Sequence, residues 1–376
     1  RHPEIEGKPA AVAGDPVNRR GIILAANYEA RKYGIKTTMI LREAFRLCPD
    51  LVIFPPDHKF YEKKSKEVMD LLSTYTPLIE QNSIDEAWLD MTGSEGLFGQ
   101  PFEAAGNIMD RIKDELNLWC SIGISENKFL AKMASEMKKP LGITELWKKD
   151  IEEKLWPLPV SQMYGVGKQT AKKLNSMGIY TIKDLALTNI EDIYKKLGKI
   201  GAELVQLANG NDDSPVNATR EEVKSIGRST TLAHDITDIE DAKAILMDLA
   251  DEVGMSARKK GKKGNTVQIT IKYANFNTIT RQMTLSPTCS IKDIFDAGVK
   301  LLEKNWTKEP VRLLGISLSG FQNENQQISL FDLDEREVKI DEKTDKKIDS
   351  LEEAILKIRK KYGTDIIKPG ISHKKE

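Results

Sequence analysis

The sequence predicts an α+β protein of several domains, and three observations support this fold class. The chain has 376 residues, a length that fits about two to four domains. Helical and strand patterns alternate over residues 57–146, as in a mostly antiparallel sheet with helices on one face. Residues 147–214 carry only helical patterns, and residues 223–321 return to mixed strand and helix. These changes predict separate domains within one chain.

Composition excludes several classes of protein. The chain is 40% hydrophobic and 30% charged, so it can bury cores. It has no signal peptide and no run of about 18 apolar residues, so we expect no membrane partner. Cys48, Cys120 and Cys289 are far apart and odd in number, which argues against disulfides or a zinc site and fits a cytoplasmic protein. The net charge is zero, so a nucleic-acid-binding protein of this composition must concentrate its Lys and Arg locally.

Each region has its own expected elements. In the first 56 residues, Gly34 stops a short helix, and Thr37 or Thr38 can cap a second helix that Pro49 ends. Strands are expected within residues 7–15, 21–26, 51–54, 78–90, 118–124, 267–273, 281–285 and 311–318. Helices are expected within residues 28–32, 61–75, 102–116, 127–137, 242–257 and 291–304, and near 351–362 at the end of a polar segment.

One stretch, Asn82 to Asp90, combines strand alternation with two adjacent carboxylates. Asp85 and Glu86 would project to opposite faces of an ideal strand, so both reach one site only at a strand end, turn or bulge. Strand interiors are poor in Asp and Glu, so this pair departs from the local strand propensity. Such a departure suggests a functional role for the two residues. Carboxylates clustered without His or Cys usually hold Mg²⁺ beside phosphate oxygens. The alternative is a solvated acidic pair at a strand end.

Four sequence blocks in register resemble the Y-family translesion DNA polymerases of the DinB/UmuC group. The resemblance covers residues 1–321. The blocks are Ser83-Ile84-Asp85-Glu86-Ala87 with Leu89-Asp90; Ala26-Asn27-Tyr28-Glu29-Ala30-Arg31 with Gly34; Asn127-Lys128, Ala131-Lys132 and Lys139-Pro140-Leu141-Gly142; and Gly165-Val166-Gly167-Lys168.

The resemblance implies a right-hand polymerase with small fingers, an α+β palm, a helical thumb and an α+β little finger. Its expected domains are fingers at 1–56, palm at 57–146, a thumb with a helix–hairpin–helix at 147–214, a linker at 215–222 and a little finger at 223–321. Residues 322–376 would form a polar tail with a clamp-binding peptide and a terminal helix.

The resemblance also implies an activity: DNA-directed DNA synthesis across damaged templates, with low fidelity and low processivity. Two Mg²⁺ ions would clamp the attacking and leaving oxygens, with Asp85 and Glu86 as catalytic metal ligands. In the family a third carboxylate and the aromatic residue that excludes ribonucleotides lie on a first palm strand, which would fall upstream of Arg1. Asp15 is a poor substitute, and Asp90 is expected to be structural. The chain as written would therefore be weakly active or inactive.

Tyr28 and Arg31 lie three residues apart, so they share a helix face. By resemblance they bind the incoming triphosphate together with Lys139. Arg can bind phosphate bidentately, and Lys acts as a point charge. The alternative is an ordinary helix surface.

The resemblance assigns the DNA backbone to two kinds of element. Glycine hairpins let backbone amides approach phosphates, and here they are Gly165, Gly167 and Lys168, echoed by Gly198 and Gly201. A basic run in the little finger, which could also be a solvated loop, comprises Arg258, Lys259, Lys260, Lys262 and Lys263.

A short apolar motif stands in the polar tail: Gln327, Ile328, Ser329, Leu330 and Phe331. It resembles the peptide by which bacterial polymerases bind the sliding clamp, and such an exposed apolar patch calls for a partner. The alternative is a local contact with the little finger. The expected partners are primer–template DNA, deoxynucleoside triphosphates and the bacterial sliding clamp, with the protein a monomer.

Two other functions compete with the polymerase. One is a catalytically silent DNA- and clamp-binding protein that lacks the first metal-ligand strand. The other is a Mg²⁺ nuclease, which is disfavoured because no His or Lys accompanies the carboxylates in sequence as a general base.

Overall fold

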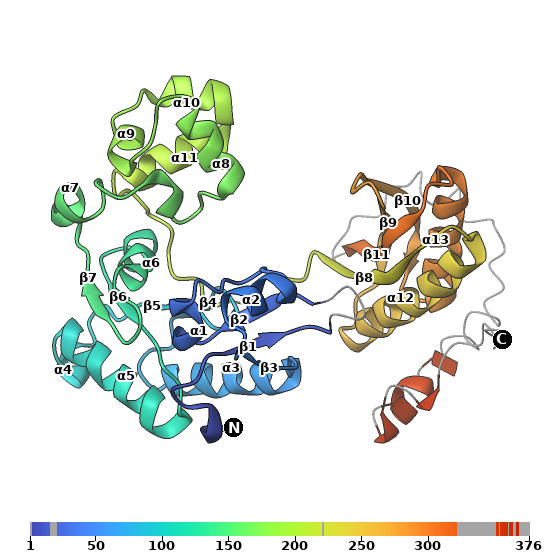
Figure 1. Ribbon diagram of the computed structural model, residues 1–376, viewed down its shortest axis with the longest axis horizontal. Coiled ribbons are helices and arrows are strands. Elements are labelled where there is room, and N and C mark those ends of the chain that lie inside the picture. Colours follow the sequence, from blue (N-terminus) through green and yellow to red (C-terminus); the bar gives the residue numbers. More distant parts are fainter. Residues whose placement is uncertain are drawn as a thin grey trace, which may run out of the picture. The chain divides into compact units, whose positions relative to one another are not determined.

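Figure 1 shows the computed structural model of the protein, which describes residues 2–15, 21–219, 222–321, 351–352, 354–359, 361–363 and 366–367. The chain forms two compact units, one of Arg1–Pro56 with Glu222–Glu376 and the other of Asp57–Glu221. This grouping does not separate the individual predicted domains, so their boundaries stay a prediction. Within the described residues, no helix is long and apolar enough to cross a membrane.

The N-terminal residues form a three-stranded sheet in the order β2-β1-β3. Its middle strand, β1 (Ala10–Ala13), is antiparallel to β2 (Ile23–Ala26) and parallel to β3 (Val52–Phe54). The short helices α1 (Tyr28–Lys32) and α2 (Leu41–Leu47) pack on it around a core that includes the fully buried Ile23 and Ala44. The elements predicted here are confirmed. The first segment, η1 (Pro3–Ile5), is a short 3₁₀ helix.

The predicted cap of α2 is wrong. Ile40, not Thr37 or Thr38, occupies the N-cap position and makes no side-chain cap. Thr38 has a φ of 73°. This left-handed conformation belongs to the turn that precedes the helix. The prediction failed because Thr37 and Thr38 lie three and two residues before the N-cap, in the turn that precedes the helix.

The second unit opens with helices and short strand pairs. The structure corrects the single, mostly antiparallel sheet predicted for residues 57–146. Here β4 and β5 pair antiparallel, and β6 and β7 form a separate parallel pair. The helices predicted here are confirmed. The elements are α3 (His58–Leu72), β4 (Ile79–Gln81), β5 (Ala87–Leu89), α4 (Glu95–Phe98), α5 (Pro101–Leu116), β6 (Ile122–Ile124), α6 (Lys128–Met137) and β7 (Ile143–Glu145).

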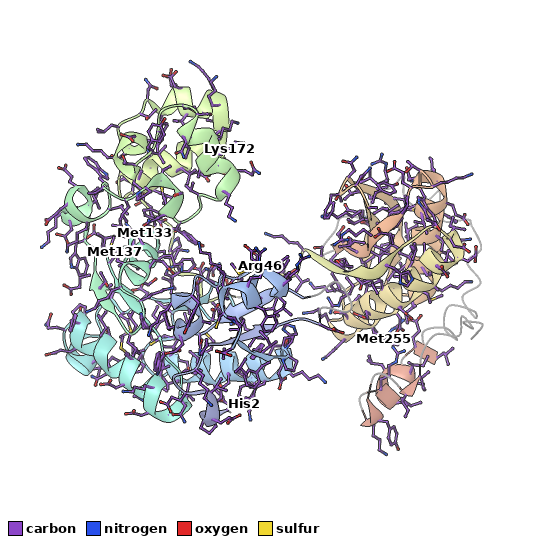
Figure 2. All side chains as sticks on the ribbon, viewed as in Figure 1. His2, Arg46, Met133, Met137, Lys172 and Met255 are labelled. Carbon is purple, nitrogen blue, oxygen red and sulfur yellow. The ribbon has the colours of Figure 1, made fainter. Side chains whose placement is uncertain are left out.

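The rest of this unit is helical, as predicted. Its core continues without a break from α6, and Met133 and Met137 extend from α6 toward the helices that follow it (Figure 2). A hydrogen bond from the Tyr164 amide to the Met133 Sδ, at 3.2 Å, reinforces this packing. The elements are η2 (Lys148–Asp150), α7 (Ile151–Lys154), η3 (Val160–Gln162), α8 (Lys168–Asn175), α9 (Ile182–Ala186), α10 (Ile190–Leu197) and α11 (Lys199–Ala208).

Residues 222–321 form a four-stranded sheet with two helices on one face. The strand order is β10-β9-β11-β8, and all neighbours are antiparallel. On β9, Val267, Ile269 and Ile271 are buried against the helices and alternate with more exposed residues. The elements are β8 (Ser225–Ile236), α12 (Ile239–Lys259), β9 (Gly264–Tyr273), β10 (Thr278–Thr288), α13 (Ile291–Asn305) and β11 (Val311–Phe321). The sequence analysis did not predict β8.

Candidate active site and nucleic-acid-binding elements

The two candidate metal ligands lie on a tight turn between β4 and β5. The predicted strand over Asn82–Asp90 is wrong for its first half, because β5 begins only at Ala87. The amides of Asn82 and Ser83 both donate to the Glu86 carbonyl, at 3.0 and 3.2 Å. The Ser83 hydroxyl lies 2.7 Å from Asp85 Oδ1. The turn frees both carboxylates from the alternation of a strand, as the adjacent pair requires.

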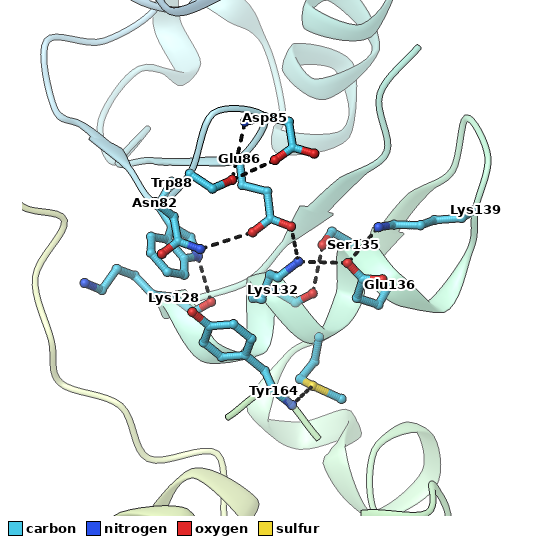
Figure 3. Close-up of polar contacts among 12 residues, drawn as sticks. Asn82, Asp85, Glu86, Trp88, Lys128, Lys132, Ser135, Glu136, Lys139 and Tyr164 are labelled. Atoms are coloured by element: carbon cyan, nitrogen blue, oxygen red, sulfur yellow. Dashed lines mark hydrogen bonds and ion pairs between the residues drawn. The ribbon is translucent and has the colours of Figure 1, made fainter. Parts of the chain in front are cut away.

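Helix α6 faces this hairpin with a stripe of charged side chains four residues apart. Lys128 Nζ contacts both carboxylate oxygens of Glu80 on β4, at 3.1 and 2.9 Å. One turn later, Lys132 Nζ lies 2.7 Å from Glu86 Oε1. The indole of Trp88 on β5 donates to the Lys128 carbonyl at 3.0 Å. The contacts of Lys132 with Glu86 and of Trp88 with the Lys128 carbonyl, both drawn in Figure 3, fix the carboxylate turn against α6.

The same stripe continues to Lys139, a candidate triphosphate ligand. Glu136 Oε1 accepts from Lys132 Nζ at 2.8 Å and from Lys139 Nζ at 2.7 Å. Burial lowers the pKa of Lys132, but the carboxylates of Glu136 and Glu86 outweigh it and raise the pKa above its ordinary value. Lys132 therefore stays protonated beside Glu86.

This arrangement corrects one argument against the nuclease. No Lys lies beside the carboxylates in sequence, but Lys132 reaches Glu86 from 46 residues away. The nuclease remains disfavoured for a different reason: an ammonium whose pKa is raised is a poor general base.

Asp90, expected to be structural, caps its own turn. Its Oδ1 accepts from the Thr92 amide at 3.0 Å, and hydrogen bonds from Thr92 hold the pKa of Asp90 below its usual range. Its carbonyl accepts from the Thr76 hydroxyl at 2.7 Å. No group of three or more His, Cys, Asp or Glu side chains that could hold a metal occurs among the described residues.

Tyr28 and Arg31 share one face of α1, as their spacing predicted. The Arg31 guanidinium lies 5.0 Å from the centre of the Tyr28 ring, and its Nε donates to the Ala26 carbonyl at 3.0 Å. Asn27 caps the helix by accepting from the Ala30 amide. This pair belongs to the first compact unit, and Asp85, Glu86 and Lys139 belong to the second.

The two glycine hairpins both begin helices. Gly165 has a φ of 88°, and Gly167 is the N-cap of α8, so exposed Lys168 is the first residue of that helix. Gly198 has a φ of 68° and joins α10 to α11. Gly201 is different: it is buried, and a Cβ there would lie 2.6 Å from side-chain atoms of Ile193 and Leu197. Its absent side chain serves the packing of α10 against α11.

The basic run is split by the structure. Lys259 is exposed at the last position of α12, and Lys260 and Lys263 are exposed just after it. Lys262 Nζ lies 3.2 Å from Glu222 Oε2. The Arg258 side chain is only 12% exposed and is ion-paired at 2.5 Å with Glu352, whose own side chain is 7% exposed. Arg258 therefore faces the C-terminal helical turns. The candidate clamp peptide, Gln327 to Phe331, lies outside the described residues.

Sequence reasoning missed two features. The first is the α6 stripe, which the spacing of Lys128, Lys132 and Glu136 could have indicated, since residues four apart share a helix face. The second is the face of the four-stranded sheet opposite its two helices, which is rich in hydroxyl and amide groups. It includes Thr266, Gln268, Thr270, Lys272, Gln282, Ser317 and Ser319, which the strand register places on the face opposite the buried residues.

Known structures with this architecture define its class. A Y-family DNA polymerase chimera of Dbh and Dpo4 matches with a TM-score of 0.77 and 27% identity, over 85% of this chain and 93% of that one. An insertion ternary complex of Dbh DNA polymerase matches with a TM-score of 0.60 and 27% identity, over 85% and 93% of the two chains. The fold is that of a right-hand Y-family polymerase with palm, thumb and little finger.

Sequence comparisons give the family. The profile of the impB/mucB/samB family matches residues 1–136, its C-terminal domain matches residues 223–330, and the IMS family HHH motif matches residues 148–179. DNA polymerase IV of Clostridium kluyveri is 63% identical, over 100% of this chain and 94% of that protein. DNA polymerase IV of Alkaliphilus oremlandii is 53% identical, over 98% and 93%. The chain belongs to the impB/mucB/samB family and is a DNA-directed DNA polymerase of the Y family.

Proposed function

We propose that this protein extends primers across damaged templates by two-metal phosphoryl transfer, with low fidelity and low processivity. The observation that carries the proposal is the turn between β4 and β5, which presents Asp85 and Glu86 together beside a lysine-bearing helix. The relatives named DNA polymerase IV support the same reaction.

Asp85 and Glu86 would hold the Mg²⁺ ions, because hard cations prefer carboxylate oxygens. Bound Mg²⁺ would neutralise charge on the transferring phosphoryl group. The chain's own contribution is to fix the ligands: Ser83 orients Asp85, and Asn82 and Lys132 each bind one oxygen of Glu86. These contacts hold the Glu86 carboxylate beside α6.

The substrate contacts follow from charge and backbone geometry. Tyr28, Arg31 and Lys139 would bind the triphosphate. The turns at Gly165–Lys168 and Gly198 would bind the DNA backbone, together with the exposed Lys259, Lys260 and Lys263. Lys262 and the sheet face opposite the two helices would contribute. Gly201 would act through packing. Ternary complexes of Dbh support DNA and nucleotide as substrates.

The remaining proposals concern partners. Gln327 to Phe331 would bind a bacterial sliding clamp as an extended peptide. The protein would act as a monomer in the cytoplasm. The domain boundaries given in the sequence analysis are part of this proposal.

Primer extension with Mg²⁺ tests the proposal, on an undamaged template and on one with an abasic site. We expect the full-length protein to extend on both. Asp85→Asn and Glu86→Gln should reduce extension about a hundredfold or more, because losing even an outer partner of a metal ligand costs roughly 10- to 100-fold. Asp90→Asn is the matched control and should still extend. DNA binding without extension by the unmodified protein would instead favour the catalytically silent DNA- and clamp-binding protein.

A further inference from the structure

Four charged side chains form a continuous chain of contacts from the candidate metal site to the candidate triphosphate site. Glu86 contacts Lys132 at 2.7 Å, Lys132 contacts Glu136 at 2.8 Å, and Glu136 contacts Lys139 at 2.7 Å. Figure 3 shows these contacts running along one side of α6. A single oxygen, Glu136 Oε1, accepts from both lysines.

We propose that Glu136 is a positioning residue that couples the metal ligand Glu86 to the phosphate-binding Lys139. The inference rests on the proposed function, which assigns those two residues their roles. In this proposal Glu136 touches neither the metal ion nor the triphosphate. It acts only through the ammonium groups of Lys132 and Lys139.

Helix geometry explains why one carboxylate reaches both lysines. Glu136 is four residues after Lys132 on α6, so their side chains lie one turn apart on one face. Lys139 follows the end of the helix, three residues after Glu136. The Glu136 carboxylate therefore lies between the ammonium groups of Lys132 and Lys139.

The buried lysine distinguishes this cluster from ordinary surface pairs, which contribute little. The Lys132 side chain is only 13% exposed, and its ammonium also lies 5.9 Å from the centre of the Tyr164 ring. With little water available, its charge is balanced by Glu86 and Glu136 together. The strength of its contact with Glu86 therefore depends on Glu136.

The first consequence concerns the metal. Without the Glu136 carboxylate, Glu86 is the one carboxylate partner left to Lys132 in the described part of the chain. A metal ion must then compete with a stronger ammonium contact for Glu86. Removing Glu136 should therefore weaken metal binding.

The second consequence concerns the nucleotide. Lys139 has a flexible side chain that is 40% exposed, and among the residues that the structure describes it forms an ion pair with Glu136 alone. Fixing such a side chain before the ligand binds reduces the conformational entropy lost on binding. Removing Glu136 should therefore weaken triphosphate binding as well.

The test is Glu136→Gln in the full-length protein, with two binding measurements that need no catalysis. Mn²⁺ binding is followed by electron paramagnetic resonance. Nucleotide binding is followed by fluorescence on a dideoxy-terminated primer–template in Ca²⁺. We expect both dissociation constants to rise roughly threefold to tenfold, as for loss of a charge-assisted hydrogen bond at a partly exposed site.

Double-mutant cycles separate coupling from a general structural effect. In a Lys132→Met background, Glu136→Gln should no longer change Mn²⁺ affinity. In a Lys139→Met background, it should no longer change nucleotide affinity. Glu67→Gln is the matched control, because Glu67 pairs with Lys64 at 2.8 Å with the same three-residue spacing on α3. It should change neither affinity.

The outcomes distinguish the inference from the function on which it rests. If Glu86→Gln leaves Mn²⁺ affinity unchanged, the proposed metal site fails and the inference fails with it. If Glu86→Gln weakens Mn²⁺ binding but Glu136→Gln changes neither affinity, only the inference is overturned. Additive effects in both cycles would also overturn it.

Discussion

Gly123 sets how closely α6 approaches the strand beneath it. A Cβ at this position would overlap the Ala131 carbonyl oxygen and lie 2.5 Å from the Ser135 amide nitrogen, and both atoms belong to the α6 backbone. Backbone cannot move aside as a flexible side chain can. The close contact between β6 and α6, the helix that carries Lys132, therefore requires glycine.

Gly123→Ala should reduce the free energy of unfolding by roughly 2–3 kcal/mol, because α6 must shift to accept the methyl group. Urea unfolding measures this. Gly106→Ala on α5 is the matched control, since a Cβ there meets nothing within 4 Å. Replacing a glycine inside a helix should stabilise the protein by about 0.5–1 kcal/mol. Equal effects of the two substitutions would contradict the packing argument.

At the scale of elements, the C-terminal helical turns dock on α12 through two buried ion pairs. Glu352 pairs with Arg258, and Arg359 Nη1 lies 2.7 Å from Asp251 Oδ2, with side-chain exposures of 10% and 13%. The acid and the base are seven residues apart on each partner, so each pair of charges shares one helix face. Their reversed order brings the turns and α12 together antiparallel. Glu352 also accepts from the Ile291 amide at 3.0 Å.

Glu352→Gln should release these turns, because it removes the carboxylate charge from the largely buried ion pair with Arg258. The cost is about 3 kcal/mol, more than a short helix can recover on its own. Hydrogen exchange of the amides of residues 354–359 should then rise sharply. Lys357→Gln, at an exposed position of the same turns, should leave exchange unchanged. Unaltered protection in Glu352→Gln would show that the ion pair does not hold the turns.

A second element-scale contact ties the chain after α11 back to the palm. The Asn217 amide donates to Glu80 Oε2 at 2.8 Å, beside the Lys128 ammonium. The Phe129 amide donates to Asp212 Oδ2 at 2.9 Å. Burial raises the pKa of Glu80, but the Asn217 amide and Lys128 outweigh it and hold the pKa below its usual range.

This lowered pKa gives a pH dependence with a definite sign. A carboxyl group with a lower pKa in the folded state stabilises the fold above its unfolded pKa, which is about 4.3 for glutamate. The contribution is lost as the pH falls through the lowered folded value. The free energy of unfolding should therefore fall less steeply with acid in Glu80→Gln than in the unmodified protein. Parallel curves between pH 3 and 7 would show that Glu80 contributes nothing.

At the scale of the whole molecule, a net charge of zero conceals locally concentrated cations. DNA affinity depends on the lysines that reach phosphates, and each such contact adds roughly 0.9 to the slope of log affinity against log salt concentration. Lys260 and Arg258 lie two residues apart. Lys260 is exposed and can reach a phosphate, whereas the Arg258 side chain is only 12% exposed and is paired with Glu352.

We expect Lys260→Gln to lower this slope by roughly 0.9 and Arg258→Gln to leave it unchanged. Fluorescence anisotropy of a labelled primer–template between about 50 and 200 mM salt measures both. A reduced slope in Arg258→Gln would mean that the ion pair with Glu352 opens on DNA.

Much of the fold could be predicted from local pattern. Helices α3, α5, α6, α12 and α13 follow from apolar spacing, and β9 and β11 follow from alternation, since each buries one face. Strand β8 was missed because its sequence, Ser225–Ile236, is mostly small and polar. It pairs with β11 through backbone bonds, which leave no trace in side-chain pattern.

The sequence by itself determined the family, the adjacent carboxylates of Asp85 and Glu86, and the glycine turns, because each depends on residues close together in the chain. Tertiary structure alone decided which charges meet. Lys132 forms an ion pair with Glu86, and Arg258 forms one with Glu352. Gly201 allows α10 and α11 to pack closely. Pairing across 46 and 94 residues depends on how helices and strands pack, and packing follows from the fit of whole surfaces rather than from any local motif.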